Sequence, residues 1–234
     1  MSNVNIPQLI QQTQSLDNNV RRAAEDNLKQ LQQRHFPNYL LELCRILQDQ
    51  SVSPVIRQGA GLLLKNAITT SRGNIAEIRQ RWTGNLDEAT RLKIKQSLLG
   101  TLTSQSEQAR STAVIVISNL AVVETLKSWK ELIPTLLQKA AMSDFAMSAS
   151  LRCIGQIAES EWTHGDLQPF SPKILECIAK GMSTAATPQK ASGSALLVQV
   201  ESMKAMYHIV ELIEPNMEQP NQQAVILQMV CCPL

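Results

Sequence analysis

The sequence contains few aromatic residues and few glycines. Only 3% of its 234 residues are Phe, Trp or Tyr, and glycine occurs 9 times. Strand-rich cores depend on aromatic and β-branched residues, whereas the abundant Leu, Ala, Ile, Gln and Ser favour helices over strands. The composition therefore predicts an all-α protein.

The stretch VIRQGAGLLLKNAI, residues 55–68, lacks the features of a membrane span and of a phosphate loop. A span needs about 18 uncharged apolar residues, and Arg57 and Lys65 interrupt this one. A phosphate loop needs a lysine directly after its second glycine, but Lys65 lies four residues after Gly61. We therefore expect an amphipathic helix and no membrane partner. Its expected apolar face holds Ile56, Gly59, Ala60, Leu63 and Ala67.

The charge is nearly balanced, with a formal net charge of +2. Residues 1–110 carry 14 Lys or Arg and 9 Asp or Glu, whereas residues 111–234 carry 8 and 11. This asymmetry suits attraction between the first half and an acidic protein surface. The asymmetry is too weak to indicate nucleic-acid binding, and the chain has too few aromatic residues for it. No nucleic-acid partner is therefore expected.

The cysteines and histidines form no recognisable site. Cys44, Cys153 and Cys177 lie singly in apolar stretches, as small buried hydrophobes do. Cys231 and Cys232 are adjacent, and neighbouring cysteines fit disulfide geometry poorly. With no signal peptide, this pattern indicates an intracellular protein. The histidines, His35, His164 and His208, are far apart and lack metal-ligand spacing, so we expect no catalysis, no metal and no cofactor.

One pattern recurs along the chain. An apolar residue, an arginine, two further residues and an alanine occur at 20–24, 56–60 and 109–113. Weaker versions at 147–151 and 198–202 open helical stripes, expected to be apolar contact faces. One stripe is Met147, Leu151, Ile154 and Ala158, and the other is Leu196, Val200, Met203, Tyr207 and Val210.

A second, proline-containing element precedes most of these patterns, at 6–10, 36–40, 133–137 and 171–175. Proline is well suited to the first turn of a helix, where its missing N–H costs nothing. Pro134 either occupies such a first turn or kinks a helix that begins near Trp129.

These two elements predict a repeating pair of helices, A and B, with the period of HEAT or armadillo repeats. The fold class is an α-solenoid of HEAT repeats, a right-handed superhelix with A helices outside and B helices inside. Small residues let the B helices approach closely, and each arginine can reach backbone or acidic groups of the next repeat. Residues 72–85 form an inserted segment or a short extra helix. The expected repeats are 1–34, 36–71, 86–124, 128–161 and 169–214, with a partial repeat at 220–234.

Several blocks resemble the amino-terminal region of the importin-β (karyopherin-β) family of nuclear transport receptors. They are NYLLELCRILQD, VIRQGAGLLLKNAIT, QRWTGNLDEATRLKIKQSLLGTL, SWKELIPTLL and ILECIAKGM, in this order. The resemblance covers nearly the whole chain. Its apolar end, VILQMVCCPL, contrasts with the polar capping helix of a complete solenoid, so we expect either a fragment or a covering surface.

The resemblance implies that the B helices of the first repeats grip the small GTPase Ran in its GTP form. The matching positions are Lys65, Asn66, Arg72 and Arg110. A lysine near a helix carboxyl end also stabilises the helix dipole, whatever else it does. Importin α or cargo is expected to bind only a longer chain, because the family's acidic loop and cargo surface lie largely beyond this region.

The resemblance also implies a groove between neighbouring A helices that takes phenylalanines of nucleoporin Phe-Gly repeats. The matching residues are Leu175, Glu176 and Ala179 on one wall and Gln222, Val225 and Ile226 on the other. The expected location is the cytoplasm, the nucleus and the nuclear envelope. The alternative function is a generic HEAT scaffold for a phosphatase, a kinase or a vesicle coat, and we expect no enzymatic activity.

Overall fold

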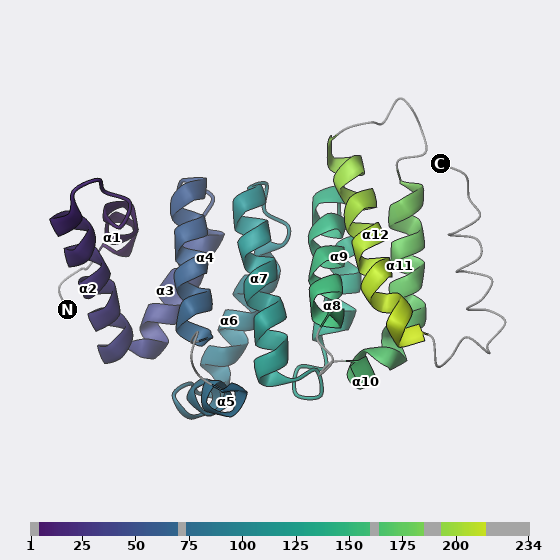
Figure 1. Cartoon of the computed structure of the whole chain (residues 1–234), viewed down its shortest axis with the longest axis horizontal. Helices are drawn as coiled ribbons and strands as arrows, with labels where there is room; N and C mark the ends of the chain where they lie inside the picture. Colours follow the sequence, from purple (N-terminus) through teal and green to yellow (C-terminus); the bar gives the residue numbers. More distant parts are fainter. Residues whose placement is uncertain (1–4, 70–73, 160–163, 185–192, 214–234) are drawn as a thin grey trace. The chain divides into compact units, whose positions relative to one another are not determined.

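The protein is all-α over the part of the chain that the structure describes. The computed structural model describes residues 5–69, 74–159, 164–184 and 193–213, and no strand occurs in these ranges. The chain divides into two compact units, residues 1–117 and 118–234, and α7 (Glu107–Glu124) contributes to both (Figure 1). No described helix is long and apolar enough to cross a membrane.

The first unit is built from successive helix pairs. α3 packs against its partner α4 and also against α6, the first helix of the next pair. α5 is an extra helix between the second and third pairs, which confirms the short-helix alternative for residues 72–85. The helices are α1 (Ile6–Gln12), α2 (Asn18–Arg34), α3 (Phe36–Gln48), α4 (Pro54–Ile68), α5 (Ile75–Gly84) and α6 (Glu88–Thr101).

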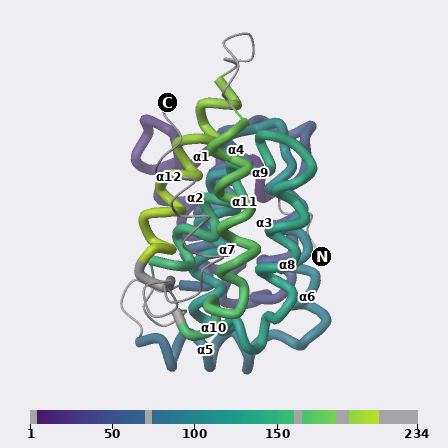
Figure 2. The backbone as a smooth tube through the Cα atoms, turned by 90° about the vertical axis from the view of Figure 1, so that its right-hand side faces the viewer, coloured from purple at the N-terminus to yellow at the C-terminus, as the bar shows by residue number. Residues whose placement is uncertain are grey.

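The second unit repeats this arrangement. α8 packs against α9, α11 packs against α12, and the second helices α9 and α12 pack against each other. Figure 2 shows α11 and α12 side by side. The helices are α8 (Leu132–Ala140), α9 (Asp144–Ala158), the short α10 (His164–Leu167), α11 (Ser171–Ser183) and α12 (Gly193–Ile213).

The helices begin where the sequence offers capping groups. The side chains of Asn5, Asp17, Ser53, Asn74, Asp87 and Ser143 accept hydrogen bonds from backbone N–H groups of the following first turns. α8 begins at Leu132, after turns at 130–131, which places Pro134 in its first turn. Pro134 therefore lies in the first turn of a helix and does not kink one already begun.

The core is formed by aliphatic side chains and includes the expected cysteines. Cys44 and Cys153 are buried, and Cys177 is half-buried. Burial raises the pKa of Cys44 to about 12 and raises the pKa values of Cys153 and Cys177. These thiols are protonated and behave as small hydrophobes. Cys231 and Cys232 lie outside the described residues.

Small residues bring the second helices of neighbouring pairs close together. A Cβ at Gly61 of α4 would clash with Thr112 Cγ2 of α7. A Cβ at Gly155 of α9 would lie 3.3 Å from Ala205 Cα of α12, which is tighter than an ordinary contact. Second helices therefore approach closely in each unit, but at Gly61 and Gly155 and not at the predicted Gly59, where an added Cβ would meet Ile10 of α1.

The predicted apolar stripe on α12 is wrong. Leu196 and Tyr207 of that stripe are 62% and 73% exposed, and Val200 and Met203 are exposed as well. The helix buries its opposite face, which contains Ala195, Val198, Glu201, Ser202, Ala205 and Ile209. By contrast, the stripe on α9 from Met147 to Ala158 is buried as expected.

α5 lies between the second and third helix pairs, and the repeat bounds drawn from the sequence stay a prediction. The partial repeat at 220–234 lies outside the described residues. The sense of the superhelix stays a prediction.

Candidate binding surfaces

Two arginines of the recurring pattern meet at one turn in the first unit. Arg57 donates from Nε to the carbonyl oxygen of Leu47 at 2.8 Å and from Nη2 to Ser104 Oγ at 2.8 Å. Arg110 donates from Nη1 to the carbonyl oxygen of Ser104 at 2.6 Å and from Nη2 to Glu107 Oε2 at 2.8 Å. Arg57 joins its helix pair to the next through the hydroxyl of Ser104, and its backbone acceptor, Leu47, lies in its own pair. The bonds of Arg110 to Ser104 and Glu107 lie within its own pair, so they do not match the predicted reach to backbone or acidic groups of the next repeat.

This geometry matters for the predicted Ran contacts, because it gives Arg110 an internal role. Only 5% of Arg110 is exposed, and its guanidinium is occupied by Ser104 and Glu107. Breaking these bonds to reach a partner would leave the buried Ser104 carbonyl unpaired. We therefore leave Arg110 out of the proposed Ran surface. Arg72 lies outside the described residues.

Lys65 and Asn66 lie near the carboxyl end of α4, as predicted. Asn66 is exposed and Lys65 is half-buried, and Lys65 has no ion-pair partner among the described residues. Its backbone carbonyl accepts from the N–H of Thr69 at 2.8 Å, which ends the helix. The Lys65 ammonium group is therefore available to an acidic partner.

The exposed face of α4 is more apolar than the sequence led us to expect. Val55, Gln58, Leu62 and Asn66 recur at helical spacing, and all four are exposed. The buried face instead contains Arg57, Ala60, Gly61, Leu64, Ala67 and Ile68. The predicted apolar face was thus right for Ala60 and Ala67, while Ile56, Gly59 and Leu63 lie at its half-buried edges.

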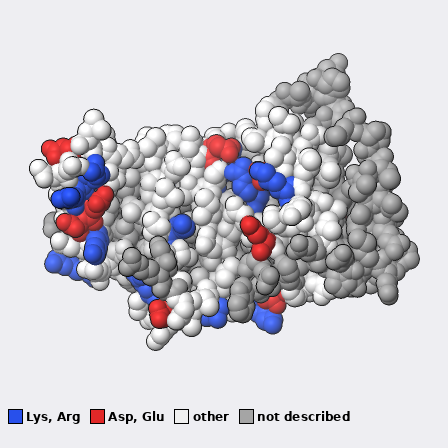
Figure 3. Space-filling view, viewed as in Figure 1, with Lys and Arg blue, Asp and Glu red and all other residues white. Residues whose placement is uncertain are grey.

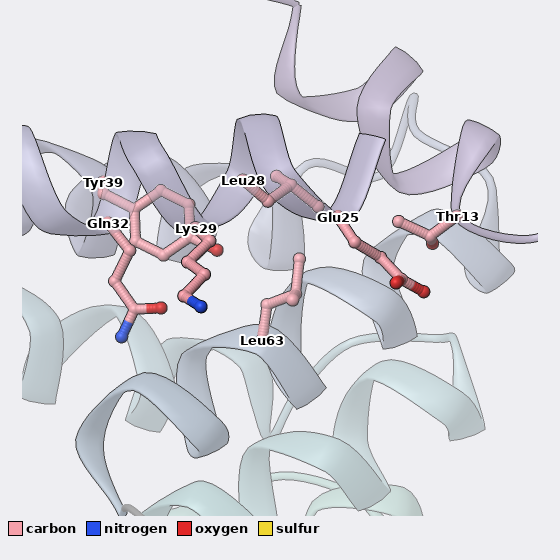
Figure 4. A pocket seen from close by; sticks show the side chains of 7 residues that line it. All are labelled: Thr13, Glu25, Leu28, Lys29, Gln32, Tyr39 and Leu63. Atoms are coloured by element: carbon pink, nitrogen blue, oxygen red, sulfur yellow. The ribbon is translucent and has the colours of Figure 1, made fainter. Parts of the chain in front are cut away.

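A cleft of about 380 Å³ lies beside this face, among the first four helices. Figure 4 shows Leu63 of α4 pointing toward Leu28 of α2, with the ring of Tyr39 to the left of both. Glu25 and Lys29 of α2 supply charges along the same wall. Burial raises the pKa of Tyr39 to about 12, so its hydroxyl stays protonated. Thr13 and Gln32 complete the lining.

The cleft has an apolar floor with polar ends, which suits a side chain of a protein partner. The sequence pattern did not reveal it, because its lining comes from α2, α3, α4 and the residue that follows α1. Exposed apolar residues also occur on the second helices at Val20 of α2 and along α12. The second helices therefore carry much of the apolar surface available for contacts.

The predicted nucleoporin wall lies on α11. Leu175 is buried together with Ile174, whereas Glu176 is exposed and Ala179 is half-buried. Ala179 and Glu176 are thus accessible to a ligand, and Leu175 is a core residue next to them. The opposite wall, Gln222, Val225 and Ile226, lies outside the described residues.

A charged cluster on α9 and α12 was missed by the sequence reasoning. Glu201 is only 2% exposed, and its Oε1 accepts from Arg152 Nη2 and Lys204 Nζ, both at 3.1 Å. Figure 3 shows Lys and Arg side chains gathered over these two helices. The signal in the sequence was Glu201 itself, a carboxylate within a long, mostly apolar helix. No group of three or more His, Cys, Asp or Glu suited to a metal occurs in the described ranges.

Comparison with known proteins shows what this chain is similar to. Residues 24–104 match the family described as Importin-beta N-terminal domain. Importin subunit beta-1 of Arabidopsis thaliana is 31% identical over 229 residues, which are 97% of this chain and 25% of that protein. Importin subunit beta-1 of Schizosaccharomyces pombe is 30% identical over 236 residues, covering 97% of this chain and 26% of that protein.

Solved structures agree with the sequence matches. Importin β crystallised in an ammonium sulfate condition superposes with a TM-score of 0.81 at 28% identity, covering 97% of this chain and 26% of that one. Kap95p with RanGDP gives 0.77 at 25% identity, with coverages of 99% and 26%. A Kap95:Nup1 complex gives 0.80 at 24% identity, with coverages of 99% and 27%, and shows the fold alone.

The fold is therefore an α-solenoid of HEAT repeats, which confirms the predicted class. Along nearly its whole length the chain corresponds to the amino-terminal region of importin β, and the resemblance drawn from the sequence blocks is confirmed. The chain spans about a quarter of the length of these relatives.

Proposed function

We propose that the chain is a segment of a nuclear transport receptor that binds Ran in its GTP form through the second helices of its first repeats. The observation that carries this proposal is the exposed face of α4. There, Val55 and Leu62 offer apolar contact area, and Lys65 and Asn66 at the end of the helix offer a positive charge and hydrogen bonds. Apolar area with a few polar groups at its edge is typical of protein interfaces.

The charge distribution supports the same surface. Residues 1–110, which include α4, carry the excess of Lys and Arg, and this excess favours encounter with an acidic partner. One similar solved structure is Kap95p with RanGDP, in which binding switches the Ran loops to the GTP-bound conformation. By analogy, we propose that this chain recognises the GTP-bound conformation of those loops.

The second proposed activity is binding of Phe-Gly nucleoporins at α11. The accessible residues Glu176 and Ala179 supply one wall of the groove, and Gln222, Val225 and Ile226 are proposed for the other. This assignment rests on the resemblance of the ILECIAKGM block. A receptor with both activities would act in the cytoplasm and the nucleus and at the nuclear envelope. Importin α or cargo would require the longer chain.

A pull-down with immobilised Ran tests the proposal. The chain should be retained more strongly by Ran loaded with a non-hydrolysable GTP analogue than by Ran loaded with GDP. Some binding to the GDP form is compatible with the proposal, since Kap95p forms a complex with RanGDP. A generic HEAT scaffold, the alternative function, predicts no nucleotide preference, and equal retention would favour it.

A further inference from the structure

A small cleft lies between α9 and α12, in the second unit. It has a volume of about 140 Å³ and is lined by Leu151, Arg152, Gly155 and Gln156 of α9 and by Glu201, Lys204, Ala205 and His208 of α12. We call it the α9–α12 cleft. Sites for drug-sized molecules occupy about 300–1,000 Å³, so a nucleotide is too large. A water occupies about 30 Å³, so a group the size of a carboxylate fits.

The polar groups of the cleft are arranged around one buried carboxylate. Glu201 is held by Arg152 and Lys204, each at 3.1 Å, and a buried carboxylate without such partners would be strongly unfavourable. The side chain of Lys204 is nevertheless 63% exposed. Among the described residues, Glu201 is its only hydrogen-bond partner, which leaves two of its three N–H donors unused.

His208 adds a further donor to the same opening. Its side chain is half-buried, and its ring meets Tyr207 edge-on, with centroids 5.3 Å apart. No hydrogen bond to its ring nitrogens occurs among the described residues. Lys204 and His208 thus present free N–H donors at one cleft, with Gln156 on the facing helix.

The net charge of the cleft lining indicates the kind of ligand that it can bind. Arg152, Lys204 and Glu201 give the lining a net charge of +1 when His208 is neutral. Residues 111–234 as a whole are acidic, with 8 Lys or Arg against 11 Asp or Glu, so this is a local positive site in a negative half. A net charge of +1 matches a monoanion such as a carboxylate better than a phosphate dianion.

We propose that the α9–α12 cleft binds the carboxylate of an Asp or Glu side chain from an acidic segment of another protein. Lys204 and Arg152 provide the charge, and His208 provides a hydrogen bond. Glu201 is a positioning residue, since it fixes both cations at the opening. The site is distinct from the Ran surface on α4 and from the nucleoporin wall on α11, and it does not depend on either activity.

Titration of the isotopically labelled chain, followed by amide shifts, tests the proposal. The probe is an acetylated, amidated hexaglutamate peptide, compared at low salt with hexaglutamine and with tripolyphosphate. We expect hexaglutamate to shift Arg152, Gly155, Lys204 and His208, and hexaglutamine to shift none of them. Equal shifts with hexaglutamine would overturn the proposal, and tighter binding of tripolyphosphate would overturn its choice of a carboxylate.

A matched pair of variants tests the role of Lys204. Lys204→Gln should weaken hexaglutamate binding about two- to fivefold, which is the effect of losing one exposed ion pair. Lys180→Gln removes the same charge from an exposed position on α11 and should leave binding unchanged. Equal weakening by both variants would show a general charge effect and would contradict the site.

Glu201→Gln distinguishes a binding site from a purely structural ion pair. The amide keeps the shape of the side chain and can still accept from Arg152, but it raises the charge of the lining from +1 to +2. We expect hexaglutamate to bind about two- to fivefold more tightly, by the same ion-pair effect. A structural role alone predicts lower thermal stability with no gain in affinity, and that result would overturn the proposal.

Discussion

At the residue scale, Arg57 shows how the recurring arginines stabilise the chain. It is 3% exposed and joins α4 both to Leu47 in its own helix pair and to Ser104 beyond α6. Burial lowers the pKa of Arg57, and the nearby Asp49 carboxylate partly offsets this. The hydrogen bonds to two acceptors therefore compensate for removing the guanidinium from water.

Replacing this arginine should be costly. Arg57→Ala leaves the buried Leu47 carbonyl without its donor and removes one of the two donors to Ser104 Oγ, which still accepts from the N–H of Ser106. An unpaired buried acceptor costs about 1–3 kcal/mol, so we expect a loss of about 1–3 kcal/mol in the free energy of unfolding. Urea denaturation followed by circular dichroism measures it. Arg22→Ala, at an exposed arginine of the first repeat, should change the same quantity by less than about 0.5 kcal/mol. Similar losses in both variants would contradict the bridging role.

The other residue-scale prediction concerns Ran. Lys65→Glu reverses an available charge on α4 and should weaken Ran-GTP binding, most clearly at low salt, where screening is least. Thermal stability should change by less than about 0.5 kcal/mol, as for most surface substitutions. Lys93→Glu makes the same charge change at an exposed position on α6 and serves as the control. If Ran-GTP binds both variants equally at low salt, Lys65 only stabilises the end of its helix.

At the element scale, close contact between second helices decides which glycines can be replaced. Gly61 of α4 faces Thr112 of α7, and the Thr112 hydroxyl donates to the carbonyl oxygen of Gln108 at 2.6 Å. This bond fixes the rotamer, so the methyl group cannot turn away without losing the bond. An added methyl group at position 61 must therefore move a helix or distort a side chain.

We expect Gly61→Ala to destabilise the chain by up to about 2 kcal/mol, because overpacking costs about 1–3 kcal/mol and the helix propensity gained offsets only about 1 kcal/mol. Adding Thr112→Ser removes the opposing methyl group and should restore part of the stability. Gly84→Ala, where the added methyl group would meet nothing within 4 Å, should be neutral or stabilising. Thermal unfolding of these variants measures the changes in stability. If Thr112→Ser does not restore any stability, the contact between positions 61 and 112 is contradicted.

The helices also show which structural features could be predicted from the sequence. Helix starts were predictable because Pro7, Pro37 and Pro172 mark them locally. The buried face of α12 was not predictable, because large apolar side chains such as Leu196 and Tyr207 lie on the exposed face. α12 packs through small residues such as Ala205 and Ser202, whose role depends on α9 and α11 and not on their own hydrophobicity.

The candidate sites also differ in how much of them could be predicted from the sequence. Lys65 and Asn66 could be located from one helix and a family resemblance. The role of Arg110 required the position of Ser104, six residues earlier but across a turn. The α9–α12 cleft required two helices about 50 residues apart in sequence to be paired, since Arg152 and Glu201 are separated by 49 residues. No local pattern contains that pairing.

At the scale of the whole molecule, weak single sites would act together in a longer receptor. A phenylalanine ring entering an apolar groove gains roughly 1.5–3 kcal/mol, and ordering a flexible repeat chain consumes much of it. Affinity for a nucleoporin would then come from several grooves through effective concentration. Quick release from each groove is compatible with transport.

This chain should therefore bind a single Phe-Gly peptide with sub-millimolar or weaker affinity. Amide shifts should be confined to residues 174–182 and to 222–230. Ala179→Asp places an unpaired charge at the half-buried position on α11 and should abolish the shifts while the rest of the spectrum stays unchanged. Shifts that persist in this variant, or that appear on α2 and α4, would show that the groove is assigned wrongly.

The central claim is that the amino-terminal repeats distinguish the two nucleotide states of Ran. Isothermal titration of the chain with Ran in its GTP-analogue and GDP forms, at one salt concentration, measures this directly. We predict at least about tenfold tighter binding of the GTP form, which corresponds to about 1.4 kcal/mol. Equal affinities for the two forms, or no binding of either at low salt, would contradict the proposed function.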